Sequence, residues 1–563
     1  MAQGAPESRL TRAVFWVLLS AILAAAGTIE LRTALGETQT WDEGIHIWSG
    51  YAYLTRGDYS WNTEHPPLVK LVSAIPLLRL GLAAPPSVGR PEPNEVTAGR
   101  EFLYANRRDA DTILISARSA NILLTLLFLA AVAWWTRRRW GWAAGILAAA
   151  LCAFDPNLIA HGRYVTTDYP LTAFFFFACV LWVEYLESGG HKRLLLAAAA
   201  IAIAMVVKYS AVLLVPTLAL LYLLCWIRRP QEFPVSRAIG AVAVVSLVLA
   251  ATVAVVYWPE TLRCFRPGAA RLETSVNVDN FIGATLAWAG HKFNLPAHDF
   301  LIGLSHVAEH NTGGHATYLM GLRSNMGFWY YFPVVFAVKS TLAALGATLL
   351  VALLGVWMLL RRGWRSITPM ALGLALPPLV YFGFSMSSGI NLGMRHILPI
   401  FPFIYVGVAV VAARVSAARW GVIAAALLAL VQIAECRSIY PDYLAFFNAA
   451  AGGPGRGPEY LVDSNIDWGQ DVKKLRTWLQ QHGTKRVRID YFGNAIVPYY
   501  GIEEVGFPAP LDQKGWDEID DYVAVNVTEL VGVYSQLHGI APIRLRHPIA
   551  KVGWSVYVYD LRK

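Results

Sequence analysis

Repeated apolar runs of membrane-spanning length constrain this chain more than any other feature of its sequence. The chain has 563 residues, of which 56% are hydrophobic and only 15% charged, and this composition is not that of a soluble globular protein. Because about 20 apolar residues in a helix cross the hydrocarbon core of a bilayer, we interpret about eleven runs as transmembrane helices. These runs lie near residues 12–30, 113–135, 141–156, 169–187, 194–207, 210–227, 237–258, 332–360, 367–385, 396–413 and 420–436. The predicted fold class is therefore a polytopic α-helical membrane protein.

Two apolar segments fit this pattern less simply. The runs 194–207 and 210–227 are short and meet around Lys208, so a merged or broken helix pair stays open there. Residues 66–84 are apolar but carry Lys70 and Arg79. We expect the latter segment to form a re-entrant or interfacial helix.

Positive charge is concentrated at the ends of the apolar runs. The clusters are Arg9 and Arg12, Arg137–Arg139, Lys192 and Arg193, Arg228 and Arg229, Arg361 and Arg362, and Arg414 and Arg419. Short cytoplasmic loops carry an excess of Lys and Arg, and alternation from a cytoplasmic N-terminus places all of these clusters inside. The net charge of +9 therefore reflects topology in the inner (plasma) membrane, and we expect no nucleic-acid partner.

The same alternation divides the chain into two parts. Residues 1–436 form a transmembrane module with a first outer loop at 31–112 and a large outer loop at 259–331. Residues 437–563 are predicted to be a soluble extracytoplasmic domain. Within them, strand-like stretches at Arg486–Tyr491, Tyr522–Val527 and Ser555–Leu561 accompany a helix near Gln470–His482. This pattern predicts a small α/β domain.

The first outer loop begins with a dense group of polar residues. Trp41–Lys70 contains the adjacent acids Asp42 and Glu43 and the histidines His46 and His65. At helical spacing, Asp42 and His46 fall on a polar face beside an apolar stripe. We expect a short helix that lies on the membrane with its polar face toward water.

Ionisable side chains recur at the outer ends of the predicted spans. Such residues are costly in a membrane and are functional candidates. The topology brings a set of them to the outer boundary: Asp42, Glu43, His65, Lys70, Asp155, Arg163, Asp168, Lys208 and Arg395. Carboxylates beside cations suit a reaction in which a hydroxyl is deprotonated while a phosphate leaves. The carboxylate takes the proton, and the cations stabilise the charge on the leaving group.

Several motifs resemble the protein O-mannosyltransferase and lipid A aminoarabinose transferase families, in the same order along the chain. They are Asp42-Glu43, His65-Pro66-Pro67-Leu68-Val69-Lys70, Arg163 with Asp168-Tyr169-Pro170-Leu171, Lys208, Gly327–Pro333 with Lys339, Arg395-His396-Ile397-Leu398-Pro399, and Asp463–Asp471. The resemblance covers nearly the whole chain. These families are polytopic glycosyltransferases of the GT-C type that use polyprenyl-phosphate sugars.

The resemblance implies an inverting transfer of a sugar from a polyprenyl-phosphate carrier to an acceptor hydroxyl outside the cytoplasm. Asp42 would be the base, and Glu43 is a second catalytic candidate. The residues expected to bind the donor phosphate are Lys70, Arg163, Lys208 and Arg395, and those expected to bind substrate are His46, His65, Asp168, Trp329 and Tyr330. The resemblance assigns no cofactor with certainty, and a divalent metal stays open because GT-C enzymes differ in their dependence on one. The acceptor also stays open, because the C-terminal segment differs from the β-trefoil domain of eukaryotic O-mannosyltransferases.

Structural interpretations compete for some of these residues. Thr40-x-x-Glu43 fits a helix capping box, and Asp155 before Pro156 fits a helix cap or turn. The aromatic residues Trp329–Phe332 equally fit an interfacial belt. In the C-terminal segment, Asp463, Asp467 and Asp471 are explained about as well by a turn and a capped helix.

Two other functions compete with glycosyl transfer. Intramembrane charge also marks transporters or flippases, although the sequence has no repeated halves with paired broken helices. His306-Val307-Ala308-Glu309-His310 matches H-x-x-E-H, a zinc-protease motif. The protease hypothesis leaves the first-loop acids unexplained, so we rank it last.

Overall fold

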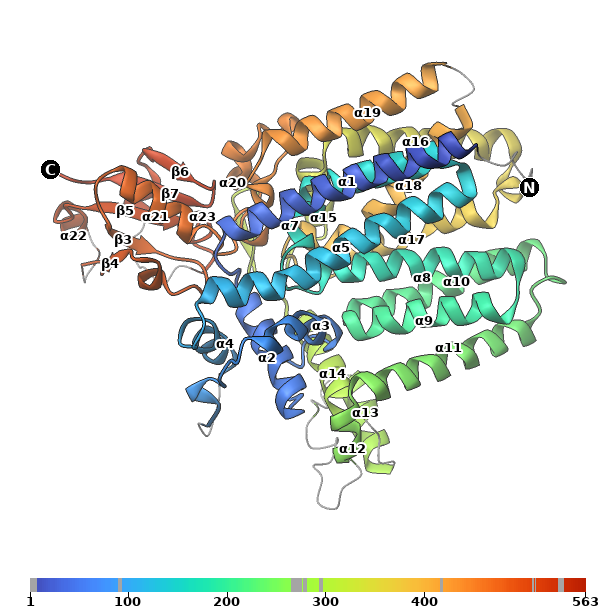
Figure 1. Ribbon diagram of the computed structural model, residues 1–563, viewed down its shortest axis with the longest axis horizontal. Coiled ribbons are helices and arrows are strands. Elements are labelled where there is room, and N and C mark those ends of the chain that lie inside the picture. The colour runs from blue at the N-terminus through green and yellow to red at the C-terminus, as the bar shows by residue number, and fades with distance from the viewer. Residues whose placement is uncertain are drawn as a thin grey trace.

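The computed structural model describes residues 8–89, 94–264, 276, 281–292, 297–415, 419–508, 511, 513–534 and 541–563. A bundle of long helices forms most of the molecule, and a β-sheet lies at one end of it (Figure 1). The bundle helices are α1 (Arg9–Gly36), α5 (Ala110–Trp140), α6 (Trp142–Ala153), α7 (Pro156–Gly162), α8 (Asp168–Ser188), α9 (His191–Val207), α10 (Leu214–Arg228), α11 (Val235–Val256), α15 (Tyr331–Lys339), α16 (Leu342–Arg362), α17 (Pro369–Ser385), α18 (Phe401–Val415) and α19 (Arg419–Ser438).

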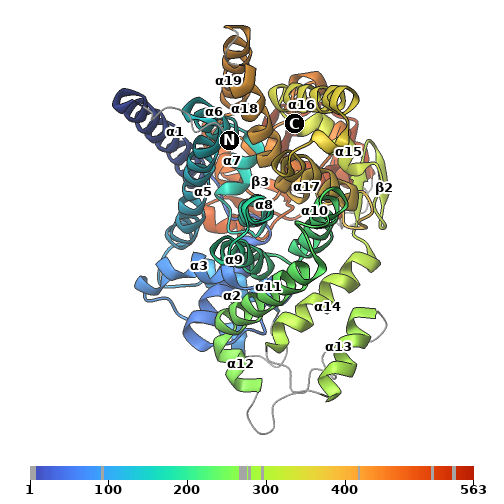
Figure 2. The same cartoon turned by 90° about the vertical axis from the view of Figure 1, so that its right-hand side faces the viewer.

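The helices of the bundle have the length and the apolar composition of membrane spans, as predicted for a multi-pass membrane protein. Within the described ranges, eight helices are long and apolar enough to cross a membrane, or nine if the bent pair α6–α7 counts as one span. The remaining predicted spans are helices α9 and α17, each of 17 residues. Every predicted run therefore contains a helix, while the count of eleven spans stays a prediction. Figure 2 shows α8 near the centre of the bundle and α1 and α19 at its periphery.

Two breaks interrupt the predicted spans. Helix α9 ends at Val207, Lys208 is extended, and the short 3₁₀ helix η3 (Tyr209–Leu213) leads into α10. Of the two alternatives at Lys208, the broken pair is the one that forms. The predicted single span 332–360 is wrong, because α15 ends at Lys339 and α16 starts after Thr341. The Thr341 side chain caps α16 by accepting from the Ala344 N–H, which stabilises the new helix start.

The first outer loop folds into three short helices, α2 (Glu43–Arg56), α3 (Leu68–Ala74) and α4 (Glu95–Tyr104), with the 3₁₀ helices η1 (Ile75–Arg79) and η2 (Pro86–Gly89). Helix α2 packs closely against α3 and α4, and a glycine lies at each of these two contacts. A Cβ atom on Gly50 would lie 2.0 Å from the carbonyl oxygen of Lys70, and one on Gly99 would lie 2.5 Å from the backbone of Gly44. Both faces of α2 are therefore buried, including His46. The prediction that its polar face meets water is wrong over most of its length.

Only part of the large outer loop lies within the described residues. It contains α12 (Trp258–Cys264), α13 (Phe281–Lys292), α14 (His298–Gly313) and an antiparallel hairpin of β1 (Thr317–Leu319) and β2 (Leu322–Ser324). Residues 265–275, 277–280 and 293–296 of the predicted loop lie outside the described ranges.

The C-terminal segment forms a mixed five-stranded sheet in the order β4-β3-β5-β7-β6. Its strands are β3 (Arg486–Asp490), β4 (Glu503–Val505), β5 (Tyr522–Asn526), β6 (Ala550–Val552) and β7 (Val556–Asp560), and its helices are α20 (Gly457–Tyr460), α21 (Val472–Gln481), α22 (Gln513–Asp517), α23 (Val527–Leu530) and α24 (Ala541–Arg544). Strand β3 is parallel to β4 and β5, and β7 is antiparallel to β5 and β6. Helix α21 buries Leu475 and Leu479 against Val487 and Val558 of the sheet. The three predicted strands and the predicted helix are thus present.

Hydrogen bonds join the C-terminal segment to the first outer loop. The Thr38 N–H donates to the Gln470 carbonyl (2.9 Å), and the Trp41 N–H donates to the Trp468 carbonyl (3.0 Å). The side-chain amide of Asn494 donates to the Trp41 carbonyl (2.8 Å). These bonds fix the backbone immediately before Asp42 against residues more than 400 positions later in the chain.

Candidate active site

A cavity of about 830 Å³ lies where the helix bundle, the loops 31–112 and 259–331 and the C-terminal segment meet. Its charged lining residues are Asp42, Glu64, Asp168, Lys208, Arg395 and Asp463, and its histidines are His46, His65, His310, His315 and His396. A cavity with convergent polar groups is the default candidate for a ligand site.

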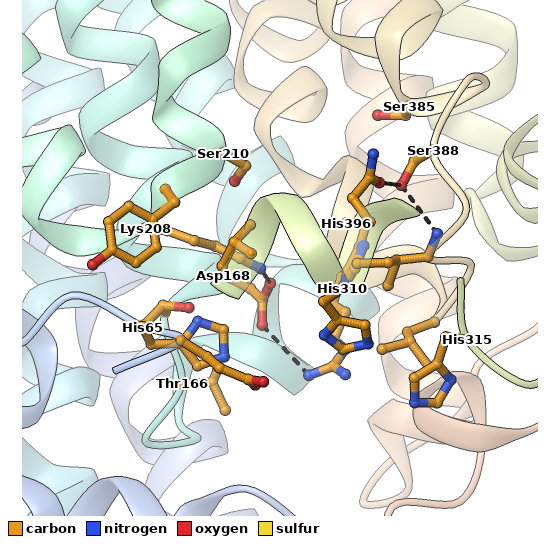
Figure 3. A pocket seen from close by; sticks show the side chains of 18 of the residues that line it. His65, Thr166, Asp168, Lys208, Ser210, His310, His315, Ser385, Ser388 and His396 are labelled. Atoms are coloured by element: carbon orange, nitrogen blue, oxygen red, sulfur yellow. Dashed lines mark hydrogen bonds and ion pairs between the residues drawn. The ribbon is translucent and has the colours of Figure 1, made fainter. Parts of the chain in front are cut away.

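Two carboxylates and two cations meet at the centre of this cavity. Arg395 Nη1 lies 2.9 Å from Asp42 Oδ2 and 4.0 Å from Asp168 Oδ2, and Lys208 Nζ lies 2.5 Å from Asp168 Oδ1. Figure 3 shows Asp168 pointing toward Lys208, with His65 on one side and His310 and His315 on the other. Of the residues that the sequence predicts to converge, Asp42, His65, Asp168, Lys208 and Arg395 do so here.

Breaks and ends of helices position these four side chains. Asp42 immediately precedes α2, and Asp168 opens α8. Lys208 occupies the extended break after α9, and Arg395 lies in the 3₁₀ helix η6 (Met394–Ile400) that leads into α18. The guanidinium carbon of Arg395 also lies 4.4 Å from the centroid of the Trp468 ring, a cation–π contact that holds the side chain in place.

Arg395 retains hydrogen-bonding capacity for an anion. Its Nε is buried and has no hydrogen-bond partner within the described part of the chain. A guanidinium carries five N–H donors in a planar fork that matches a phosphate or carboxylate. Arg395 therefore has donors beyond the one that contacts Asp42, and its side chain lines the cavity.

The two histidines from the first loop are neutral at pH 7. His46 Nδ1 lies 2.7 Å from the Val165 carbonyl; because a carbonyl oxygen only accepts, Nδ1 carries the proton and Nε2 is an acceptor. Burial lowers the pKa of His46 to about 4. Burial also lowers the pKa of His65, whose ring packs edge-on at 5.2 Å from that of His46. Both rings therefore supply neutral hydrogen-bonding groups, not charge.

The lowered pKa of His46 predicts how the free energy of unfolding depends on pH. Its folded pKa of about 4 lies below the unfolded value of about 6.5. The unfolded state therefore binds the proton first, and stability falls as pH drops from about 6.5 to about 4. We expect the difference in unfolding free energy between wild type and His46→Gln to shrink by about 3 kcal/mol over this window. Detergent-solubilised protein unfolded at a series of pH values measures this difference, and a constant difference would contradict it.

Two residues predicted to bind the donor phosphate, Lys70 and Arg163, lie outside the cavity and have buried partners of their own. Lys70 Nζ donates to the Tyr53 hydroxyl (2.8 Å) and to the Asn62 carbonyl (2.7 Å). Arg163 binds Glu37 through Nε (3.0 Å) and Nη2 (2.7 Å). Neither cation lines the cavity, so the phosphate contact predicted for each lacks geometric support.

Glu43 is likewise turned away from the cavity. Its carboxylate accepts from Arg118 Nε (2.8 Å) and Nη2 (2.6 Å), from the Thr40 N–H (2.8 Å) and from the Val165 N–H (3.0 Å). The bond to Thr40 is the one that the capping-box interpretation predicts. Because every contact of Glu43 is structural, its predicted catalytic role has no geometric support either.

Of the other residues singled out in the sequence, some line the cavity and others do not. Trp329 is 69% exposed, and neither Trp329 nor Tyr330 lines the cavity. Asp155 caps α7 by accepting from the N–H groups of Asn157 and Leu158, as its helix-cap interpretation predicts. Of the zinc-protease motif, His310 lines the cavity, whereas His306 Nδ1 lies 3.1 Å from the Thr63 hydroxyl.

The described residues contain no group of three or more His, Cys, Asp or Glu side chains that could hold a metal ion. The zinc-protease hypothesis therefore gains no support from them. Dependence on a divalent metal stays an untested prediction.

Sequence reasoning missed the contribution of the C-terminal segment to the cavity. Asp463, Trp468, Phe492 and Tyr534 all line it. The sequence singles out the Asp463–Asp471 stretch, but its spacing does not distinguish the cavity residue Asp463 from Asp467. The Asp467 carboxylate instead accepts from Asn526 Nδ2 (2.6 Å) within the C-terminal segment. Phe492 and Tyr534 carry no sequence signal that separates them from ordinary core residues.

Comparison with known protein families matches part of the chain to a family that the motifs resemble. The family described as dolichyl-phosphate-mannose-protein mannosyltransferase matches residues 112–258, the segment that supplies Asp168 and Lys208 to the cavity. This match spans about a quarter of the chain and is consistent with the resemblance that the sequence motifs predict. No curated protein matches the sequence.

Among solved structures, ArnT from Cupriavidus metallidurans bound to undecaprenyl phosphate matches with a TM-score of 0.46 and 14% identity over 96% of this chain and 97% of that chain. The apo state of the same ArnT matches with a TM-score of 0.47 and 14% identity over 97% and 98% of the two chains. The archaeal oligosaccharyltransferase AglB from Archaeoglobus fulgidus, in complex with an inhibitory peptide and a dolichol-phosphate, matches with a TM-score of 0.45 and 12% identity over 96% and 74%.

Proposed function

We propose that the protein is an inverting glycosyltransferase that moves a sugar from a polyprenyl-phosphate carrier to an acceptor hydroxyl. The observation that carries the proposal is the group of Asp42, Asp168, Lys208 and Arg395 in one cavity that is polar at its centre and apolar on one side. The polar centre fits the phosphate and the reacting hydroxyl, and the apolar side fits the lipid.

The cations are placed to bind the donor phosphate. Arg395 has a buried Nε without a partner in the described part of the chain, and Lys208 is a second cation at the same carboxylate, Asp168. As the bond between sugar and phosphate breaks, negative charge grows on the phosphate oxygens. Preorganised N–H donors stabilise that charge in the transition state more than in the bound donor.

The apolar side of the cavity fits a polyprenyl chain. Its lining includes Val212 and Leu213 before α10, Leu304 and Val307 of α14, and Phe384 of α17. Val212 is 45% exposed and Phe384 49% exposed, and both lie on helices of the membrane bundle. A lipid tail can therefore leave the cavity between these helices into the hydrocarbon core.

Asp42 is the proposed base. Its carboxylate lies 2.9 Å from Arg395 Nη1, beside the proposed phosphate site, and a carboxylate can take the proton of the acceptor hydroxyl as that oxygen attacks the anomeric carbon. Attack from the face opposite the phosphate inverts the configuration at this carbon. With a cytoplasmic N-terminus, the cavity and the C-terminal segment face the outside of the plasma membrane.

Arg395 provides a direct test of the donor site. Replacing it by alanine removes the charge-assisted bonds to the phosphate, so we expect about 10- to 100-fold weaker binding of undecaprenyl phosphate. Arg395→Lys keeps the charge without the planar fork and should fall between alanine and wild type. Binding is measured by the ligand-induced rise in melting temperature of the protein in nanodiscs. Arg476→Ala, an exposed position on α21, is the control, and equal binding by Arg395→Ala and the control would refute the donor site.

A further inference from the structure

Three aromatic rings form a continuous stack along one side of the cavity, and two of them come from the C-terminal segment. The Trp41 and Phe492 ring centroids are 5.2 Å apart with an interplanar angle of 20°. Those of Phe492 and Tyr534 are 5.4 Å apart with an angle of 6°. All three residues line the cavity. We call Trp41, Phe492 and Tyr534 the aromatic column.

Polar groups accompany the column. The Tyr534 hydroxyl donates to Asp463 Oδ2 (2.9 Å) and lies 3.3 Å from His315 Nδ1. Asp463 has a left-handed backbone with φ of 58°. The Ser464 N–H, which donates to Asp463 Oδ1 (2.5 Å), and the Thr528 hydroxyl, which accepts from the Asp463 N–H (3.1 Å), hold the loop in place. A carboxylate, a phenol and an imidazole thus line the cavity beside the rings.

The column lies beside the reaction centre. Trp41 directly precedes Asp42 in the chain, and its N–H is held by the Trp468 carbonyl. Trp468 in turn carries the Arg395 guanidinium on its ring. A molecule resting along the column is therefore next to the proposed base and to the cation proposed to bind the donor phosphate.

We propose that the aromatic column, with Asp463 and His315, is the acceptor subsite and that the acceptor is a carbohydrate. This inference rests on the proposed transferase function and adds the class of acceptor to it. The C–H groups on one face of a pyranose ring meet an aromatic face favourably, and the two end rings, Trp41 and Tyr534, each have a second face that Phe492 does not cover. The hydroxyls of the sugar need donors and acceptors at fixed positions. The column and its polar neighbours supply both.

A carbohydrate fits the aromatic column better than an extended peptide does. Peptide recognition commonly adds a strand to an exposed sheet edge or uses a helix-binding groove. The aromatic column belongs to neither: Trp41 precedes α2, Phe492 follows β3, and Tyr534 follows α23. The rings instead hold one another in place by stacking and have few rotatable bonds, so little side-chain entropy is lost when a sugar binds against the end rings.

Direct binding measurements on the full-length protein in nanodiscs test the subsite. Saturation-transfer NMR is recorded with cellobiose, maltose, methyl α-mannoside and a Ser/Thr-containing hexapeptide, and binding of undecaprenyl phosphate is measured separately. In Phe492→Leu, which removes the middle ring, we expect sugar binding to weaken by about tenfold while undecaprenyl phosphate binds as in wild type. Tyr534→Phe, which removes only a hydroxyl, should weaken sugar binding by a smaller factor and keep the fold. Tyr499→Leu, an aromatic residue of the same segment outside the cavity, is the matched control.

The outcomes separate the two proposals. Failure of all three sugars to bind wild type, or equal binding to Phe492→Leu, Tyr534→Phe and the control, overturns the carbohydrate subsite. Binding of the hexapeptide alone, weakened in both column variants, also overturns it, in favour of a peptide acceptor. Sugar binding that depends on the column in a protein that does not bind undecaprenyl phosphate supports the subsite and overturns the proposed donor.

Discussion

Replacement of Asp42 by asparagine is expected to slow sugar transfer by about 10²- to 10⁴-fold, the usual contribution of a positioned general base. Asparagine has nearly the same shape, and its Oδ1 can still accept the hydrogen bond from Arg395 Nη1, which lies 2.9 Å from the native carboxylate. It cannot take a proton from the acceptor. The loss should therefore fall on the rate of transfer, while donor binding is kept or strengthened because a negative charge beside the phosphate is removed.

Single-turnover transfer from a radiolabelled polyprenyl-phosphate sugar, together with undecaprenyl phosphate binding by the same preparation, measures both quantities. Asp111→Asn is the matched control, because Asp111 is 46% exposed and pairs with Lys473 away from the cavity. Transfer at the wild-type rate by Asp42→Asn would remove Asp42 from the mechanism. Loss of donor binding together with transfer would assign Asp42 to the donor site instead of the base.

The helices of this protein were predictable because they depend on local composition. Apolar runs must become helices in a bilayer, where backbone groups have no water to bind. The break at Lys208 could also be anticipated, since the apolar runs on either side of it are short. The break after Lys339 could not. It depends on the Thr341 cap and on Asn448, whose side-chain amide donates to the Ser340 carbonyl from a distant part of the chain.

The site was predictable only in part, because sequence gives the side of the membrane but not the partner of each charge. Asp42, Lys208 and Arg395 were expected at one end of the bundle, and they meet there. Lys70 and Arg163 were expected with them, yet Asn62 and Glu37 hold these cations elsewhere. Glu37 and Arg163 are 126 residues apart, and no spacing rule links them. The aromatic column could not be predicted either, since its stacking depends on how the C-terminal segment packs against the residues before α2.

Glu43 should behave in the opposite way to its neighbour Asp42: its loss should destabilise the protein without removing the chemistry. The side chains of Glu43 and Arg118 are both 0% exposed, and their charged atoms lie 2.6 Å apart. Removing one partner of a buried ion pair leaves the other charge uncompensated, which costs about 3–5 kcal/mol. Glu43→Ala should therefore unfold at much lower denaturant concentration, and transfer per folded molecule should stay within a few-fold of wild type because Glu43 does not line the cavity.

Denaturant unfolding of Glu43→Ala and of the double variant Glu43→Leu/Arg118→Met separates a structural role from a catalytic one. The double variant replaces both charges by apolar side chains, so much of the lost stability should return. Glu459→Ala is the control, because its exposed ion pair with Arg456 should contribute less than about 1 kcal/mol. A stable Glu43→Ala protein that has lost transfer would reverse the assignment and make Glu43 the acid that the reaction needs. The two adjacent acids would then exchange roles, and the cavity around Asp42 would serve binding alone.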